Sequence, residues 1–381
     1  RILETGVVES GYNCEQTLRF SCSCPVMNAL IQKSIRTLYV CMRDNFMDCP
    51  DRERGQWIGD ATVQTPQAIL AFDERAALLV RKAILDFILL RKGDMLTGNV
   101  PGADFSELPG QSLTAIGTFG MIAEYVRLTG DKSVLPLALE PAVKYLMLWE
   151  TDGNGRLLPR EGNWRWFDHL FNADEPVLEN ALYYSALRFA ADTAKELDVR
   201  DYDDFLDRRR KDIEKRFETE FWNGRFYTSD GRADDRANAI AVLAGLVPKN
   251  RFIQIRFVLQ SVQTASIYME YFVLKALCEM GYYHDAYLRM RSRYYNLAVN
   301  ENTTLWEDFN VLGTKNHAWS GGPLNIVLQY FAGITTDDGF QNCKINPICD
   351  LFSEMNVSFC VRGKRTEICV QKNQAEIHNH L

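Results

Sequence analysis

Two carboxylates in separate stretches of the sequence carry its most specific chemistry. Glu53 lies in residues 47–60, which read MDCPDRERGQWIGD, and Glu307 lies in residues 302–308, which read NTTLWED. Cleavage of a glycosidic bond needs one carboxyl group to protonate the leaving oxygen and a second to assist the attacking group; a separation of about 5 Å predicts retention and about 6.5–9.5 Å predicts inversion. We therefore expect each stretch to supply one half of a glycoside-hydrolysis site.

The neighbours of Glu53 suit this residue to the acid role. Asp48 and Asp51 are close in sequence and Trp57 limits solvation, and both effects raise the pKa of a carboxyl group. Arg52 and Arg54, which flank Glu53, lower its pKa unless they point at sugar hydroxyls or at Asp48. The alternative interpretation of the stretch is a solvated salt-bridge loop, because charge runs usually lie on solvated faces. For Glu307 the alternative is a helix-capping or salt-bridged residue.

Aromatic and polar side chains in other stretches have the chemistry to hold a sugar. Residues 162–169 read GNWRWFDH, in which Trp164 and Trp166 offer stacking faces beside groups that hydrogen-bond hydroxyls. Trp306 directly precedes the second carboxylate, and His317 begins the last inner helix. The alternatives are a hydrophobic loop packed on the rim and a structural histidine.

Other chemistries lack their motifs. No Gly-rich phosphate loop follows a strand, there is no Gly-x-Ser-x-Gly elbow, and His-x-x-x-His and paired Cys-x-x-Cys are absent, so we expect no metal and no cofactor. Asp104 and Glu107 are weaker candidates for the site. The net charge of −7 without a dense Lys/Arg block argues against a nucleic-acid partner. The lack of a run of about twenty apolar residues argues against a membrane span.

The ten cysteines are irregularly spaced in a chain of 381 residues, which is unlike a disulfide framework. We expect most of them to be buried thiols, a weak indication of a reducing compartment. The chain begins at Arg1 without a signal peptide, as a mature or excised segment does. Cytoplasmic localisation is therefore the expectation, with a periplasmic or secreted protein as the alternative. Nothing in the sequence indicates an oligomeric state.

Helical periodicity dominates the chain from Pro25 to about residue 333. The pattern predicts helices at 25–47, 62–72, 74–92, 111–129, 133–149, 175–197, 201–220, 233–246, 250–260, 266–280, 282–297 and 317–332. Short connections alternate with mostly long ones, and short connections make antiparallel hairpins. The alternation predicts a mainly α fold, an (α/α)6 barrel with all long loops on one rim. Each candidate stretch described above lies in such a loop or directly after one.

Strand-like alternation flanks the helical region on both sides. Residues 1–24 alternate apolar and polar side chains, and the pattern returns after Gly333. We expect three domains: residues 1–24 as strands left from an upstream β domain, residues 25–335 as the catalytic barrel, and residues 336–381 as a small β-sandwich.

The first stretch resembles the signature of the α-L-rhamnosidases of glycoside hydrolase family 78. The resemblance is carried by Asp48-Cys49-Pro50-x-Arg52-Glu53-Arg54-x-x-Trp57-x-Gly59-Asp60, by Thr303-Thr304-x-Trp306-Glu307 and by Asn316-His317-Ala318-x-Ser320-x-Gly322-Pro323. It extends to the layout of strands, barrel and C-terminal β domain. The resemblance implies an inverting exo-hydrolase that releases terminal α-L-rhamnose from glycosides or polysaccharides without a catalytic metal.

Residue by residue, the resemblance makes Glu53 the general acid and Glu307 the base that activates water. Sugar-binding positions match Asp48, Arg52, Trp57 and Asp60, while Trp164 matches a stacking residue and His317 a sugar-contacting histidine. The sequence departs from the family pattern at two places. An acidic residue that some members have between the Arg and the catalytic Glu is missing, and residues 100–110 lack a Trp that members often have there. Both departures bear on which sugar and which aglycone the site accepts. The alternatives are a barrel glycosidase acting on another sugar and a non-catalytic carbohydrate-binding protein.

Overall fold

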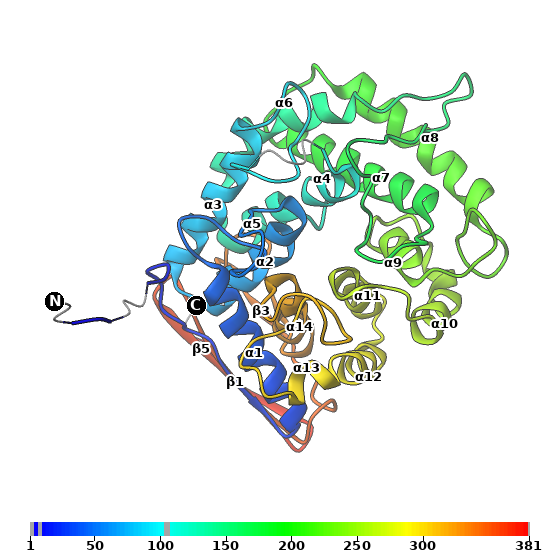
Figure 1. Cartoon of the computed structure of the whole chain (residues 1–381). Coiled ribbons are helices and arrows are strands. Elements are labelled where there is room, and N and C mark those ends of the chain that lie inside the picture. Colours follow the sequence, from blue (N-terminus) through cyan, green and yellow to red (C-terminus); the bar gives the residue numbers. More distant parts are fainter. Residues whose placement is uncertain (1–3, 7–9, 103–106, 380–381) are drawn as a thin grey trace.

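The computed structural model describes residues 4–6, 10–102 and 107–379, and helices dominate it (Figure 1). In chain order the α-helices are α1 (Pro25–Cys41), α2 (Ile58–Ala71), α3 (Glu74–Leu89), α4 (Pro109–Ala115), α5 (Met121–Thr129), α6 (Leu135–Leu146), α7 (Glu175–Glu196), α8 (Asp203–Phe221), α9 (Asp235–Leu243), α10 (Phe252–Ser261), α11 (Ile267–Glu279), α12 (Tyr283–Arg293), α13 (Tyr295–Val299) and α14 (Gly322–Ile326). Shorter helical turns are η1 (Lys132–Val134), η2 (Lys249–Arg251), η3 (Ala318–Gly321) and the π-helical η4 (Val327–Phe331). The mainly α character that the periodicity predicts is confirmed.

Six helices contact one another in a closed circuit. α2 packs against α4, α4 against α7, α7 against α9, α9 against α11, α11 against α14, and α14 against α2. α2 is buried along its whole length, its polar residues Asp60, Gln64 and Gln67 included. α11 is almost fully buried, as expected for a helix that is apolar on most faces. The helices α1, α3, α6, α8, α10 and α12 each pack against a member of this circuit.

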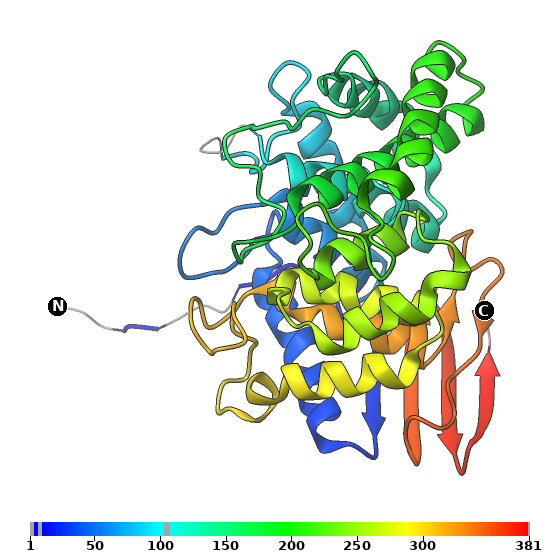
Figure 2. The ribbon, with the colours of Figure 1, turned by 90° about the vertical axis from the view of Figure 1, so that its right-hand side faces the viewer.

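The long connections lie together at one end of the helices. Figure 2 shows the loops before α2, α7 and η3 extending from the same side of the helical body, with the strands toward the other side. These three loops contain the stretches that the sequence singles out for chemistry.

The helices beside the charged stretch differ from their predicted ranges. α1 ends at Cys41, because residues 42–46 form a tight turn closed by a Met42–Phe46 bridge. α2 begins at Ile58 rather than at residue 62, with Trp57 as its N-cap. The earlier start places Asp60 in the first turn of a helix, where the helix dipole favours a negative charge.

The helix predicted over residues 111–129 is two helices. α4 ends at Ala115 and α5 begins at Met121, and two glycines lie between them. A Cβ added at Gly120 would lie 2.2 Å from the backbone oxygen of Thr114, so the chain passes too close to itself there for a larger residue. In the same way residues 282–297 divide into α12 and α13, and residues 317–332 are built from η3, α14 and η4.

The strands form two antiparallel sheets. Four strands lie in the order β1 (Arg19–Cys22), β4 (Glu354–Val361), β5 (Lys364–Gln371) and β6 (Gln374–Asn379), while β2 (Ile334–Thr335) pairs with β3 (Lys344–Ile345). Alternate residues of the larger sheet are buried, among them Met355, Val357 and Phe359 of β4. The register pairs Phe20 of β1 with Val357, so the first and last parts of the chain share one sheet.

The expected β-sandwich at 336–381 stays a prediction, because the described residues form one four-stranded and one two-stranded sheet. The three domain boundaries likewise stay predictions. Across the described ranges the ten cysteines are free thiols, of which Cys24, Cys41, Cys49 and Cys278 are buried and the others are half-buried or exposed. None of the helices in those ranges has the length and apolar character to cross a membrane.

Candidate active site

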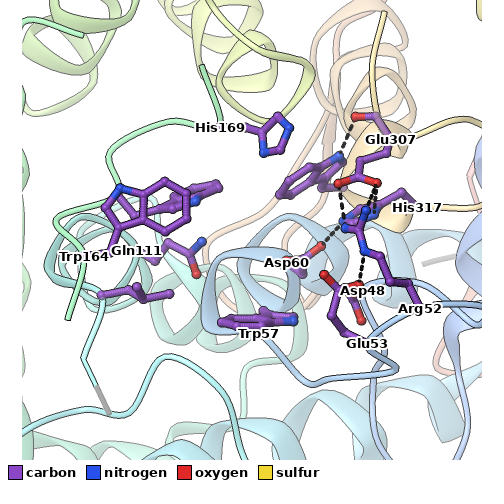
Figure 3. A pocket seen from close by; sticks show the side chains of 13 residues that line it. Asp48, Arg52, Glu53, Trp57, Asp60, Gln111, Trp164, His169, Glu307 and His317 are labelled. Carbon is purple, nitrogen blue, oxygen red and sulfur yellow. Dashed lines mark hydrogen bonds and ion pairs between the residues drawn. The ribbon is translucent and has the colours of Figure 1, made fainter. Parts of the chain in front are cut away.

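A cavity of ≈ 320 Å³ opens among the long loops, at the N-terminal ends of α2, α4 and η3. Its volume lies within the range of about 300–1,000 Å³ that is usual for small-ligand sites. Its walls are formed by Asp48, Arg52, Glu53, Trp57, Asp60, Leu108, Gln111, Trp164, Trp166, His169, Glu307, His317 and Trp319 (Figure 3). Nine of the ten residues that the sequence predicts for the site are among them.

Hydrogen bonds within the charged stretch fix the loop that carries Glu53. The backbone N–H of Asp48 donates to the Gly55 oxygen at 2.9 Å, and the Gly55 N–H donates back to Asp48 Oδ1 at 2.8 Å. The Cys49 thiol lies between two carboxylates, with its Sγ 3.0 Å from Asp48 Oδ2 and 3.3 Å from Glu53 Oε2. Asp48 is therefore buried directly beside Glu53.

Arg52 joins the two candidate catalytic carboxylates. Its Nε donates to Glu53 Oε2 at 2.6 Å, while Nη1 and Nη2 donate to the two oxygens of Glu307 at 2.9 and 2.8 Å. A bidentate contact between a guanidinium and a carboxylate is strong and fixes geometry. Glu53 and Glu307 thus face each other across one guanidinium, although 254 positions separate them in sequence (Figure 3).

The second carboxylate is held in place by its own loop. The Thr314 N–H donates to Glu307 Oε2 at 2.8 Å, and the Glu307 N–H donates to the Thr314 oxygen at 3.0 Å. Gly313 has a φ of +74°, and a Cβ there would lie 2.5 Å from Glu307 Oε2, so only glycine allows this close wrapping. Burial raises the pKa of Glu307, but the hydrogen bonds from Arg52 and the Thr314 backbone outweigh it and lower the pKa.

The expected rise of the Glu53 pKa is wrong for this arrangement of the site. Burial does raise the pKa, but hydrogen bonds from Arg52, Asp48 and Cys49 outweigh it and lower the pKa to about 2. The reason is that Arg52 points at Glu53 instead of at Asp48 or at solvent. Asp48 shows the opposite shift: burial and the charge of Asp60 raise its pKa to about 7. Of the adjacent pair, Asp48 is the group that binds a proton near neutral pH.

The base of the cavity contains a buried histidine–carboxylate pair. His317 Nε2 lies 3.0 Å from Asp60 Oδ1, and its Nδ1 lies 3.1 Å from the Thr314 hydroxyl. Burial lowers the pKa of His317, but the hydrogen bond and charge of Asp60 outweigh it and raise the pKa above the usual value. Burial likewise raises the pKa of Asp60. The pair is therefore poised to donate to or accept from the hydroxyls of a ligand.

Indole rings form one side of the cavity. Trp166 lies at the centre, with ring centroids 6.0 Å from both Trp164 and Trp319, and Trp319 lies 4.0 Å from the His317 ring. Trp166 is almost fully buried, whereas Trp164 is 43% exposed. Trp164 is thus the outer ring, open to a ligand at the mouth of the cavity.

Some predicted residues do not reach the cavity. Trp306 does not line it; its half-buried ring lies 5.3 Å from the Lys315 ammonium, and Trp319 of the following helical turn lines the wall instead. The weaker candidate Glu107 is buried and paired with Arg160, at 3.0 Å between Oε2 and Nη2. Asp104 lies outside the described residues.

Four lining residues are absent from the predicted set: Leu108, Gln111, His169 and Trp319. His169 and Trp319 stand inside stretches that the sequence analysis singled out, so proximity to those motifs was the available signal. Gln111 accepts from the Gly59 N–H at 3.0 Å, a contact between two distant segments that carries no sequence signal.

One group of possible metal ligands occurs within the described ranges: atoms of Asp48, Cys49 and His317 lie within 4.8 Å of one another. Each of these side chains already has a protein partner: Asp48 accepts from Gly55, Cys49 donates to two carboxylates and His317 pairs with Asp60. Chemistry without a metal stays a prediction.

Helical hairpins around a cavity with opposed carboxylates define a glycosidase-like class of protein. Residues 15–331 match the family model described as the bacterial alpha-L-rhamnosidase 6 hairpin glycosidase domain. The chain belongs to this family. Among curated proteins, no sequence matches the chain.

Solved structures share the fold. The GH78 family rhamnosidase of Bacillus sp. GL1 has a TM-score of 0.81 at 21% identity, covering 96% of this chain and 42% of that chain. The Streptomyces avermitilis α-L-rhamnosidase complexed with L-rhamnose has a TM-score of 0.77 at 19% identity, and the match covers 94% of this chain and 38% of that chain. A Klebsiella oxytoca rhamnosidase with rhamnose bound has a TM-score of 0.69 at 21% identity, and the match covers 83% of this chain and 66% of that chain. The present chain spans less than half the length of the first two.

Proposed function

We propose that this chain is the catalytic part of an inverting exo-α-L-rhamnosidase. The observation that carries the proposal is the pair Glu53 and Glu307, which face one cavity from two loops and share Arg52, in a member of a rhamnosidase-domain family. The closed circuit of six helices supports an (α/α)6 barrel as the scaffold of this site. The rhamnose named with two of the solved structures supports rhamnose as the sugar.

In the proposed mechanism Glu307 is the base. In the free site Arg52 and the Thr314 N–H lower the pKa of its carboxylate; the Thr314 N–H does not depend on Arg52, so Glu307 stays ionised when a sugar displaces Arg52 and accepts a proton from a water molecule near neutral pH. The water then attacks the anomeric carbon from the face opposite the leaving oxygen. Inversion follows because the water occupies the space between the sugar and the base.

The acid in this mechanism is Glu53, supplied with its proton by Asp48. In the free site Arg52 keeps Glu53 ionised, and Asp48 holds the proton because of its raised pKa. A bound sugar offers hydroxyls to the half-exposed Arg52 guanidinium and draws it from Glu53. The pKa of Glu53 then rises, the proton passes to it from Asp48, and Glu53 delivers it to the leaving oxygen.

The shape of the cavity supports attack on a terminal sugar. Its base is closed by His317, Asp60 and Trp319, each at most 4% exposed. A sugar chain cannot pass through such a base, so the cavity suits one end unit. The aromatic wall and the His317–Asp60 pair then offer stacking and hydrogen bonds to that unit.

Rhamnose release from an aryl α-L-rhamnoside tests the proposal. We expect Glu53→Gln and Glu307→Gln to lose at least about 100-fold in kcat, because each removes a proton-transfer group. Glu301→Gln is the matched control, an exposed residue of the same loop as Glu307, and should retain activity. Undiminished turnover in either site variant contradicts the roles. A panel of aryl glycosides separates rhamnose from other sugars, and binding without turnover would indicate a carbohydrate-binding protein.

A further inference from the structure

Residues 162–172, in the connection between α6 and α7, supply three side chains to the wall of the catalytic cavity: Trp164, Trp166 and His169 (Figure 3). Trp166 has a φ of +42°, a left-handed conformation that is uncommon for a residue other than glycine. Such a conformation persists only where the surrounding structure fixes it. The aromatic wall therefore depends on whatever holds this loop.

The loop is anchored at one buried carboxylate, that of Asp168. Its two oxygens accept four hydrogen bonds. The His169 N–H donates at 2.8 Å and Arg236 Nη1 donates at 2.9 Å. The other two come from Ser266, whose N–H donates at 3.0 Å and whose hydroxyl also donates. Because Ser266 is the N-cap of α11, the carboxylate ties the loop to the first turn of that helix.

Arg236 extends the anchor to the backbone of the loop. It is 1% exposed, and it donates to the Leu170 oxygen at 3.2 Å through Nη1 and to the Asn172 oxygen at 3.1 Å through Nη2. Its Nε and Nη2 also donate to the two oxygens of Asp234, the N-cap of α9, at 3.0 and 2.8 Å. A planar guanidinium can make all these contacts at once, whereas a lysine ammonium cannot.

The anchor determines where the central indole of the wall lies. Tyr268 follows Ser266 by two residues, and its buried ring packs on Trp166 at 5.1 Å and on Trp319 at 5.7 Å between centroids. The hydrogen bonds from Ser266 to Asp168 therefore set the position of Trp166 against Tyr268.

We propose that Asp168 and Arg236 are positioning residues of the active site, which hold the aromatic wall where a sugar ring binds. Neither residue lines the cavity, so both act through the side chains of the loop. The inference rests on the proposed function and assigns residues that the proposed mechanism does not use. Glu53 and Glu307 are held by partners in other loops. Loss of the anchor should therefore weaken sugar binding and raise KM, with kcat nearly unchanged.

Arg236→Lys is the test variant, because it keeps the positive charge between the two aspartates and loses the planar fork. We expect the Kd of L-rhamnose, measured by calorimetry, and the KM for an aryl α-L-rhamnoside to rise about fivefold to tenfold, the loss of one aromatic contact. The value of kcat should stay within about threefold, because the catalytic carboxylates keep their partners. If Arg236 only neutralised buried charge, the lysine variant would bind rhamnose like the wild type.

Arg289→Lys is the matched control. Arg289 is also buried and also contacts two carboxylates, Asp235 at 2.6 Å and Glu270 at 2.6 Å, together with the backbone oxygens of Leu259 and Val262. None of these partners belongs to residues 162–172 or lines the cavity. Both variants should lose stability in urea, but only Arg236→Lys should weaken rhamnose binding. Equal weakening in the two variants would contradict the proposal.

Ser266→Ala provides a second, milder variant that decides the question if Arg236→Lys does not fold. It removes one of the four hydrogen bonds to Asp168 and keeps every charge, so KM should rise by about twofold to threefold. An unchanged KM in the folded variants, or a fall in kcat without a rise in KM, overturns the proposal.

Near-UV circular dichroism reports the packing of the aromatic rings without any ligand. The aromatic signal should change in Arg236→Lys and in Ser266→Ala and stay the same in Arg289→Lys. If the wild type neither binds nor cleaves a rhamnoside, the proposed function fails separately. The dichroism then decides the positioning role alone, and an unchanged signal in Arg236→Lys contradicts it.

Discussion

Arg52 contacts both candidate catalytic carboxylates, and this contact lowers the pKa of each. The guanidinium occupies the position between acid and base where a sugar and a water molecule must bind in the proposed reaction. Arg52 is half-exposed, so its displacement toward the cavity mouth breaks no core packing. We interpret the contact as the resting arrangement of the site.

Replacement of this arginine should change the pH dependence of the reaction. In Arg52→Met, Glu307 loses the partner that lowers its pKa, so the acidic limb of kcat/KM should move to higher pH. The value of kcat/KM at the optimum should fall by about tenfold to 100-fold, the loss expected for hydrogen bonds to a charged group. Arg54→Met is the control, because Arg54 donates to the Pro50 oxygen and to neither carboxylate. An acidic limb that stays in place would contradict this role.

The proton supply is tested at Asp48. Because its pKa is raised to about 7, Asp48 holds its proton below that pH, and wild-type kcat/KM should fall as pH rises through about 7. Asp48→Asn removes the proton source and should lower kcat by about 10²–10⁴-fold and move the basic limb to lower pH. Asp51→Asn, an exposed neighbour in the same loop, should leave both limbs unchanged. A normal basic limb in Asp48→Asn would exclude the proton supply.

The residues of the site were predictable where they belong to short sequence motifs with recognisable chemistry. The charged stretch and the Trp-Glu pair predicted both carboxylates and four further lining residues, and residues 162–169 together with His317 supplied three more. The direction in which Arg52 points was not predictable, because it depends on Glu307 arriving from a distant loop. For that reason the predicted rise of the Glu53 pKa was wrong. Gln111 was missed because its contact with Gly59 is formed only by folding.

At the scale of elements, the ends of the helices position the side chains of the site. The first turn of α2 presents Asp60 to the cavity. α4 begins at the cavity, and the chain turns at the break between α4 and α5, at the other end of α4. Periodicity predicted the helix interiors well, since apolar spacing determines the buried face. It missed the early start of α2 and the break after Ala115, because caps and close backbone approaches are local features that periodicity does not report.

The break in the inner helix should be sensitive to one methyl group. Gly120→Ala would place its Cβ 2.2 Å from the Thr114 oxygen, so the backbone must shift. We expect a loss of about 1–3 kcal/mol in the free energy of unfolding, the usual cost of overpacking. Gly153→Ala is the control, because an added Cβ there meets nothing within 4 Å. Urea denaturation measures both variants, and equal midpoints would show that the helix break tolerates a side chain.

At the scale of the whole molecule, the helices bring loops that are far apart in sequence to one end. The mainly α character was predictable from the apolar spacing, and the family match covers residues 15–331. The pairing of β1 with β4 was not predictable, because strand partners more than 330 residues apart leave no local signal. The chain spans 42% of the Bacillus rhamnosidase that shares its fold, so the activity of the full protein is part of the proposal.

The stereochemistry of the first product tests the central claim most directly. Proton NMR of the wild-type chain acting on an aryl α-L-rhamnoside reports which anomer appears before mutarotation. A single displacement by a water held on Glu307 predicts β-L-rhamnose as the first product. Initial release of α-L-rhamnose would contradict the inverting mechanism, and no release of rhamnose would contradict the proposed function.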